Sequence, residues 1–134
     1  MDRIDKILNH DLFLYHLGRN NAAEADRRFC RHGMVHFLDV ARIGTIIALE
    51  EGLKIDREWI YAAALLHDCG KHEQYENGIP HEQASARIAP EILKACGFND
   101  EETGVIVTAI SRHRDPEAAK EKNLNGILYR ADKA

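Results

Sequence analysis

The segment that most constrains this chain runs from Ala62 to Lys71 and reads AAALLHDCGK. Its small and apolar residues predict a buried helix, which ends in an adjacent histidine and aspartate, His67 and Asp68. Burying an imidazole and a carboxylate costs free energy unless a partner compensates them. A divalent cation is a suitable partner, because neutral imidazole and carboxylate oxygen are both ligands of first-row metals. The alternative is an ordinary helix C-terminus, with Gly70 as its stop and Lys71 near the negative end of the helix dipole.

The size and composition of the chain predict one folded domain. Its 134 residues are 45% hydrophobic and 30% charged, with a formal net charge of −4, so we expect no nucleic-acid duplex as a partner. Eight histidines are many for this length and are a first sign of metal chemistry. Cys30, Cys69 and Cys96 are an odd number without C-x-x-C spacing, which indicates reduced thiols in a cytoplasmic protein. We expect neither a signal peptide nor a membrane span, because no apolar run is long enough.

Hydrophobic periodicity predicts helices along the whole chain and no strand. One or two short amphipathic helices are expected over residues 3–18, followed by a turn at Gly18–Asn21 and an alanine- and charge-rich helix over residues 22–32. His10 and His16 lie on these early elements without a consistent apolar face. They are therefore predicted to lie at the surface or to cap a helix.

The later helices have recognisable ends. A long helix follows Gly33 and stops at Gly52, and Asp56 is a suitable N-cap for the helix that leads to His67.

A polar stretch with a turn at Asn77-Gly78 then precedes a helix over residues 81–96, which Pro90 should kink or split. Asn99 and Glu102 have the spacing of a capping box for the next helix.

Five of these helices each place a candidate metal ligand at one end of an apolar face. A single histidine on such a face is usually a hydrogen-bonded core residue. Several of them together with two acids would each need a separate buried partner. Convergence on one or two metal ions satisfies all of them together. The candidates are His36, His67, Asp68, His81, His113 and Asp132.

Three segments resemble the HD-domain superfamily of metal-dependent phosphohydrolases. They read HFLDVA at residues 36–41, LLHDCGK at 65–71 and LYRADK at 128–133. The resemblance runs from about residue 32 to the C-terminus. It implies an all-α chain folded as a single compact HD-domain helical bundle over residues 1–134. The N-terminal helices would occupy residues 1–32 and the metal-binding core residues 33–134.

The resemblance also implies two metal positions that share one aspartate. One ion would take His36, His67, Asp68 and Asp132, and the other would take Asp68, His81 and His113. The pattern is similar to bacterial diadenosine-tetraphosphate hydrolases of this superfamily, and resemblance to that group implies two irons. We therefore expect one or two divalent transition-metal ions per chain, iron first, with manganese, nickel, cobalt and zinc left open.

The chemistry expected from these parts is hydrolysis of a phosphate ester or anhydride in a nucleotide or a related small phosphate compound. Two nearby cations lower the pKa of a shared water and clamp phosphoryl oxygens. Asp68 is the central catalytic candidate, and Lys71 either neutralises a phosphate or is a plain helix-end charge. Arg112 and Arg114 are predicted to be surface charges. Candidates for hydrogen bonds behind the ligands are His72 and Asp39.

Two other functions stay open. One is a mononuclear HD nucleotidase in which His81 and His113 contact phosphate instead of a metal. The other is a catalytically silent HD fold that binds a nucleotide. The expected partner is a small-molecule phosphate substrate and not a membrane, and the sequence leaves a homodimer open.

Overall fold

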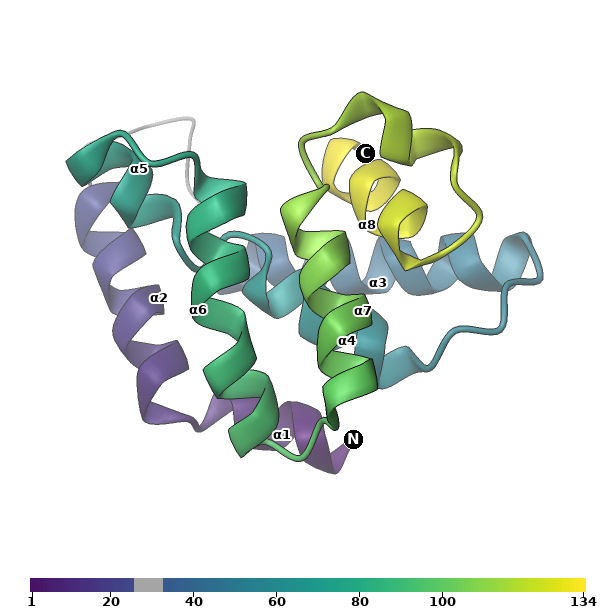
Figure 1. Cartoon of the computed structure of the whole chain (residues 1–134), viewed down its shortest axis with the longest axis horizontal. Coiled ribbons are helices and arrows are strands. Elements are labelled where there is room, and N and C mark those ends of the chain that lie inside the picture. The colour runs from purple at the N-terminus through teal and green to yellow at the C-terminus, as the bar shows by residue number, and fades with distance from the viewer. Residues whose placement is uncertain (26–32) are drawn as a thin grey trace.

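Every regular element in the part of the chain that the structure describes is a helix. The computed structural model describes residues 1–25 and 33–134, and no strand occurs among them. None of the described helices is long and apolar enough to cross a membrane. The all-α prediction is confirmed (Figure 1). The elements are α1 (Asp2–Leu8), α2 (Asp11–Ala23), α3 (Met34–Glu50), α4 (Arg57–Leu66), α5 (Lys71–Asn77), α6 (His81–Ala95), α7 (Asp100–Ser111), the 3-10 helix η1 (Pro116–Lys120) and α8 (Leu124–Lys133).

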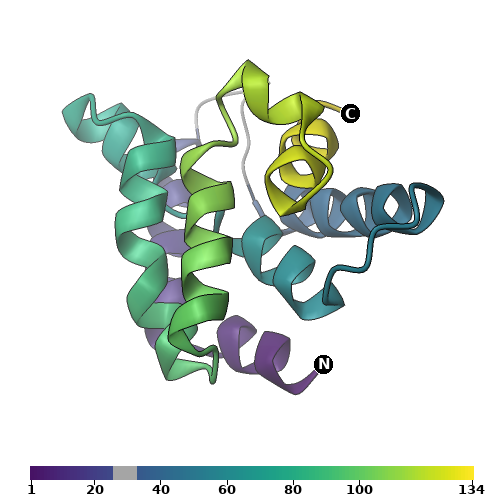
Figure 2. The same cartoon turned by 45° about the vertical axis from the view of Figure 1, so that its right-hand side comes forward.

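The short helix α4 lies at the centre of the fold. Residues 62–66, its second half, are fully buried, and α4 contacts α1, α3, α6, α7 and α8. Figures 1 and 2 show α6 and α7 side by side on one flank, with α3 and α8 packed together on the other. Because three of the five buried residues are alanines, the surrounding helices approach α4 closely. The end of α4 therefore lies among the ends of several other helices.

Local capping signals set several helix starts as predicted. Asp56 caps α4 by accepting a hydrogen bond from the backbone N–H two residues later, at 2.8 Å. Asn99 and Glu102 form the predicted capping box of α7, since each side chain accepts from the backbone N–H of the other. His10 caps α2 through Nδ1, which agrees with its predicted role. These signals act within one turn of helix and need no tertiary partner.

Helix α6 continues through Pro90, so of the two predicted outcomes, a kink or a split, the split does not occur. A proline inside a helix removes one backbone hydrogen bond and crowds the preceding turn. The packing of four buried neighbours offsets that cost and holds both halves in one helix. They are Ile88, Ala89, Ile92 and Leu93.

The predicted turn at Gly18–Asn21 is also wrong, because α2 continues to Ala23. Asn20 is fully buried and uses its side chain to bind the turn after α4, so it lies inside a helix where its propensity alone favours a turn. The helix predicted over residues 22–32 is tested only at its start. Residues 26–32 lie outside the described residues.

His16 is buried, which corrects its predicted place at the surface or in a cap. Its side chain is 8% exposed, and its Nδ1 lies 2.8 Å from Nε2 of His72. The two rings are stacked with their centroids 5.1 Å apart. This contact joins α2 to α5, which the sequence pattern presented as a polar stretch without a helix.

Gly70 begins α5 and does not end α4 as a C-terminal stop. Its φ of −96° lies in the ordinary region, so the backbone conformation does not demand glycine. Lack of space requires glycine here, because a Cβ at this position would lie 2.7 Å from the Cβ of Ala84 and 2.7 Å from the backbone nitrogen of Ser85. Gly70 also donates its N–H to Oγ of Ser85 at 2.9 Å. The missing side chain therefore lets α6 pack directly against the turn that follows α4.

We expect Gly70→Ala to lower the free energy of unfolding by about 1–3 kcal/mol, because the added methyl overpacks this contact. Gly104→Ala is the matched control, since Gly104 is exposed within α7 and an added Cβ meets nothing within 4 Å. That control should gain about 0.5–1 kcal/mol from helix propensity. Urea denaturation of both variants measures the two effects. Equal stabilities for the Gly70 variant and the wild type would contradict the role of space at this position.

Candidate metal centre

The structure brings all six predicted ligands together at the end of α4. Within the described residues they form two groups that share Asp68, and in each group the ligand atoms lie within 4.8 Å of one another. Group A is His36, His67, Asp68 and Asp132, and group B is Asp68, His81 and His113. His36 lies in the first turn of α3, His67 directly follows α4, Asp68 lies in the next turn, His81 begins α6, His113 follows α7, and Asp132 lies in the last turn of α8.

In group A, imidazole nitrogens surround two carboxylates. Oδ1 of Asp132 lies 3.2 Å from Nε2 of His36 and 3.3 Å from Nε2 of His67. Oδ2 of Asp68 lies 3.3 Å from Nε2 of His67 and 3.8 Å from Nε2 of His36. Four side chains from the ends of three helices and one turn thus converge on a small volume.

In group B, the other oxygen of Asp68 is used. Its Oδ1 lies 3.4 Å from Nε2 of His81 and 3.3 Å from Nε2 of His113. The two imidazole nitrogens are 3.1 Å apart. The carboxylate of Asp68 therefore faces group A with one oxygen and group B with the other.

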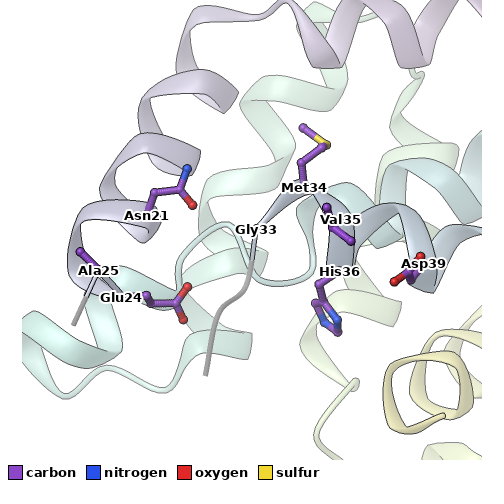
Figure 3. A pocket seen from close by; sticks show the side chains of 8 residues that line it. All are labelled: Asn21, Glu24, Ala25, Gly33, Met34, Val35, His36 and Asp39. Carbon is purple, nitrogen blue, oxygen red and sulfur yellow. The ribbon is translucent and has the colours of Figure 1, made fainter. Parts of the chain in front are cut away.

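The centre is buried on one side and open on the other. His67 and His113 are fully buried, whereas the side chain of His36 is 31% exposed. A pocket of about 520 Å³ adjoins His36 and lies between the end of α2 and the start of α3. Figure 3 shows Asn21 and Glu24 on one wall and the start of α3, with His36, on the other. His36 is the member of group A that lines this pocket.

Hydrogen bonds to carbonyl oxygens set the tautomers of three histidines. Nδ1 of His67 lies 2.6 Å from the carbonyl oxygen of Ala64, and Nδ1 of His113 lies 2.7 Å from that of Ile110. Nδ1 of His81 lies 2.7 Å from Oε1 of a glutamine side chain, which also accepts from the backbone N–H of His81. Because a carbonyl oxygen only accepts, each Nδ1 carries its hydrogen, and the neutral rings present a bare Nε2.

These bare nitrogens point at each other and at carboxylate oxygens, which are also acceptors. Such a cluster needs a positive charge at its centre, either a proton or a metal ion. The donor set fits a divalent first-row metal, because imidazole nitrogen and carboxylate oxygen are its usual ligands. An N–H donated to a carbonyl oxygen behind the ligand atom is the usual arrangement of metal-bound histidine. The residues present therefore fit a metal centre.

The two groups differ in how they respond when only protons are available. Burial opposes protonation of His67, but Asp68 and Asp132 outweigh it and raise its pKa to about 10. Burial also opposes ionisation of Asp132, yet hydrogen bonds with His36 and His67 hold its pKa well below the usual range. Burial lowers the pKa of His81 to about 3 despite the opposing charge of Asp68. Group A thus holds a proton readily, whereas His81 stays neutral.

The other predicted functional residues have varied surroundings. Nζ of Lys71 lies 3.3 Å from Nδ1 of His81, behind the ring with respect to its ligand atom Nε2. Arg112 pairs with Asp115 and Glu121, and Arg114 is exposed, as predicted for surface charges.

The hydrogen bonds behind the ligands come from backbone carbonyls and from Gln74, which the sequence analysis missed. His72 pairs with His16, and Asp39 pairs with Arg42. Gln74 lies in a polar stretch with no apolar periodicity, so the sequence carried no signal for it.

Comparisons with known proteins identify the family. The model of the HD domain matches residues 33–134, so the chain belongs to the HD domain family. An uncharacterized protein of Clostridium beijerinckii is 50% identical over 133 residues, which cover 99% of this chain and 83% of that relative. A crystal structure of a predicted HD superfamily hydrolase from an uncultured Thermotogales bacterium is similar, with a TM-score of 0.68 and 27% identity. The similarity covers 90% of this chain and 66% of that neighbour's length.

The metal-free chain should lose stability as the pH rises from 6.5 toward 10. His67 has a raised pKa when folded, so its contribution is fully present below the unfolded value of 6.5 and disappears as the pH passes the folded value of about 10. Asp132→Asn removes one of the two carboxylates that raise the pKa of His67. The stability of this variant should therefore fall less than that of the wild type between pH 6.5 and 10. Urea denaturation with a chelator present gives both curves, and parallel curves would contradict the assignment.

Proposed function

We propose that this chain is a metal-dependent phosphohydrolase that cleaves a phosphate ester or anhydride bond of a nucleotide or a related small phosphate compound. The observation that carries the proposal is the shared carboxylate of Asp68, whose two oxygens face two separate groups of ligand atoms. Membership of the HD domain family and the likeness to a predicted HD superfamily hydrolase support the same reaction class.

Each ligand group would hold one divalent ion, with iron as the first candidate and manganese, nickel, cobalt or zinc as alternatives. When bound, such ions supply Lewis acidity toward phosphoryl oxygens and acidify water near neutral pH. The chain keeps His67, His81 and His113 oriented through their Nδ1 hydrogen bonds, so the ligand atoms are arranged before the ions bind.

We infer that a substrate also contacts residues beside the two ligand groups. The partly exposed His36 joins group A to the pocket beside it, which supports entry of a phosphate group from that side. Asn21 offers polar atoms on one wall of the pocket, whereas Met34 and Val35 offer apolar contact on the other. These walls suit the part of a substrate that is not phosphate. Lys71 adds a half-buried positive charge behind His81.

The chemistry of group B favours two ions over one. A mononuclear nucleotidase would use His81 and His113 to contact phosphate. With Nδ1 bound to Gln74 and its pKa lowered to about 3 by burial, His81 presents a lone pair and not an N–H to the centre. A lone pair repels phosphate oxygen, whereas it binds a cation.

Protein purified without chelators should carry close to two first-row metal ions per chain. His113→Ala removes a ligand of group B alone, so it should carry close to one ion, because group A keeps its four ligands. His10→Ala is the control, since His10 caps α2 and lies outside both groups, and it should keep two. Elemental mass spectrometry gives these numbers. One ion in the wild type would favour the mononuclear alternative.

Asp68→Ala should lower kcat by about a thousandfold or more, because the residue belongs to both ligand groups and acts as part of one unit. Turnover should be measured on dinucleoside polyphosphates and on nucleoside mono-, di- and triphosphates with each candidate metal. Circular dichroism should show that helical content is kept. Retained activity in this variant would contradict the mechanism, and nucleotide-dependent stabilisation without any turnover would favour a silent binding module.

A further inference from the structure

Asn20 connects the N-terminal helices to the metal-bearing turn. It lies on α2, outside residues 33–134 that match the HD domain, and its side chain is fully buried. Its Nδ2 donates to the backbone carbonyl oxygen of Asp68 at 2.9 Å, and its Oδ1 accepts from the backbone N–H of His72 at 2.9 Å. One amide thus binds the backbone at both ends of the turn between α4 and α5.

This turn carries two adjacent ligands, His67 and Asp68, on a segment without regular helical hydrogen bonds. Its conformation therefore has to be held by contacts from outside the turn. Within the turn, the N–H of Lys71 donates to the carbonyl oxygen of Asp68. From the opposite side, Oγ of Ser85 on α6 accepts the N–H of Gly70. Asn20 on α2 and Ser85 on α6 therefore hold the turn between two helices.

The side chain of Asp68 depends on this backbone. Its two oxygens lie 3.3 Å from Nε2 of His67 and 3.3 Å from Nε2 of His113, so a small rotation of the residue would spoil one group or the other. Functional groups of this kind must be held within about 0.5 Å of their working positions. A hydrogen bond to the backbone carbonyl of Asp68 holds the peptide plane that follows its Cα and so fixes the direction from which the side chain starts.

We propose that Asn20 is a positioning residue of the metal centre: through the carbonyl of Asp68 it orients the carboxylate that both ligand groups share. The proposal rests on the metal centre described above but not on the identity of the substrate. It extends the working part of the chain beyond the matched domain, because α2 then contributes to metal binding without supplying a ligand. A residue that only fills the core would change stability and leave the metal environment as it is.

The test compares Asn20→Leu with His16→Leu. His16 lies one turn earlier on α2, is buried, and contacts the side chain of His72 but not the backbone of the turn. Both variants leave a buried polar group without its partner, so both should lower the stability of the metal-free chain. Only Asn20→Leu should weaken cobalt(II) affinity, by about ten- to hundredfold, as loss of outer hydrogen-bond partners does in other metal sites.

Two readouts on full-length protein decide the matter: competition with a chelator for cobalt(II), and the visible absorption bands of the cobalt-loaded centre. We expect altered bands and weaker affinity for Asn20→Leu, and wild-type values for His16→Leu. Wild-type bands and affinity in Asn20→Leu, despite lower stability, would overturn the proposal. If Asn20→Leu does not fold, Asn20→Ala removes both hydrogen bonds without adding bulk or charge, and the same criteria apply.

The same experiment separates this inference from the proposed function. A wild-type chain that binds cobalt(II) with the expected difference between variants, but hydrolyses no phosphate compound, would support the positioning role and remove the hydrolase. A wild-type chain that binds no metal would overturn both.

Discussion

The burial of the Asp68 carboxylate is the constraint on which the rest of this structure depends. A buried negative charge costs several kcal/mol unless other groups compensate it, and here the compensating groups come from separate elements. Burial opposes its ionisation, but the positive charge held at His67 keeps its pKa well below the usual range. Helices α3, α4, α6, α7 and α8 each contribute a side chain from one of their ends. The other four helices therefore pack around α4 in a way that brings these ends together.

The tautomers of the histidines decide what this centre can accept. Carbonyl oxygens take the Nδ1 hydrogens of His67, His81 and His113, so bare nitrogens face carboxylate oxygens. A cation resolves that conflict in both groups, whereas a proton resolves it readily at His67 but not at His81. The same hydrogen bonds that satisfy buried polar groups thus prepare a site for metal ions.

Much of the fold and of the centre was predictable because the relevant signals are local. The i, i+4, i+7 spacing that follows His36 places it on an apolar face, and the caps at Asp56 and Asn99 act within one helical turn. The predictions that were wrong concern residues whose partners lie far away in the sequence. Asn20 looked like a turn residue because its partner is 48 positions away, and His16 looked exposed because His72 is 56 positions away. Pro90 looked disruptive because the packing that offsets its cost is tertiary.

By itself, the sequence determined that the chain is helical, where most helices begin, and which six side chains could ligate a metal. Those properties follow from periodicity and residue chemistry, which act over a few residues. Only the tertiary structure decided that Asp68 turns one oxygen to each group, that Gly70 is required by the approach of α6, and that Asn20 holds the turn from α2. The physical reason is that orientation and close approach depend on elements far apart in the chain, which meet only when the core packs.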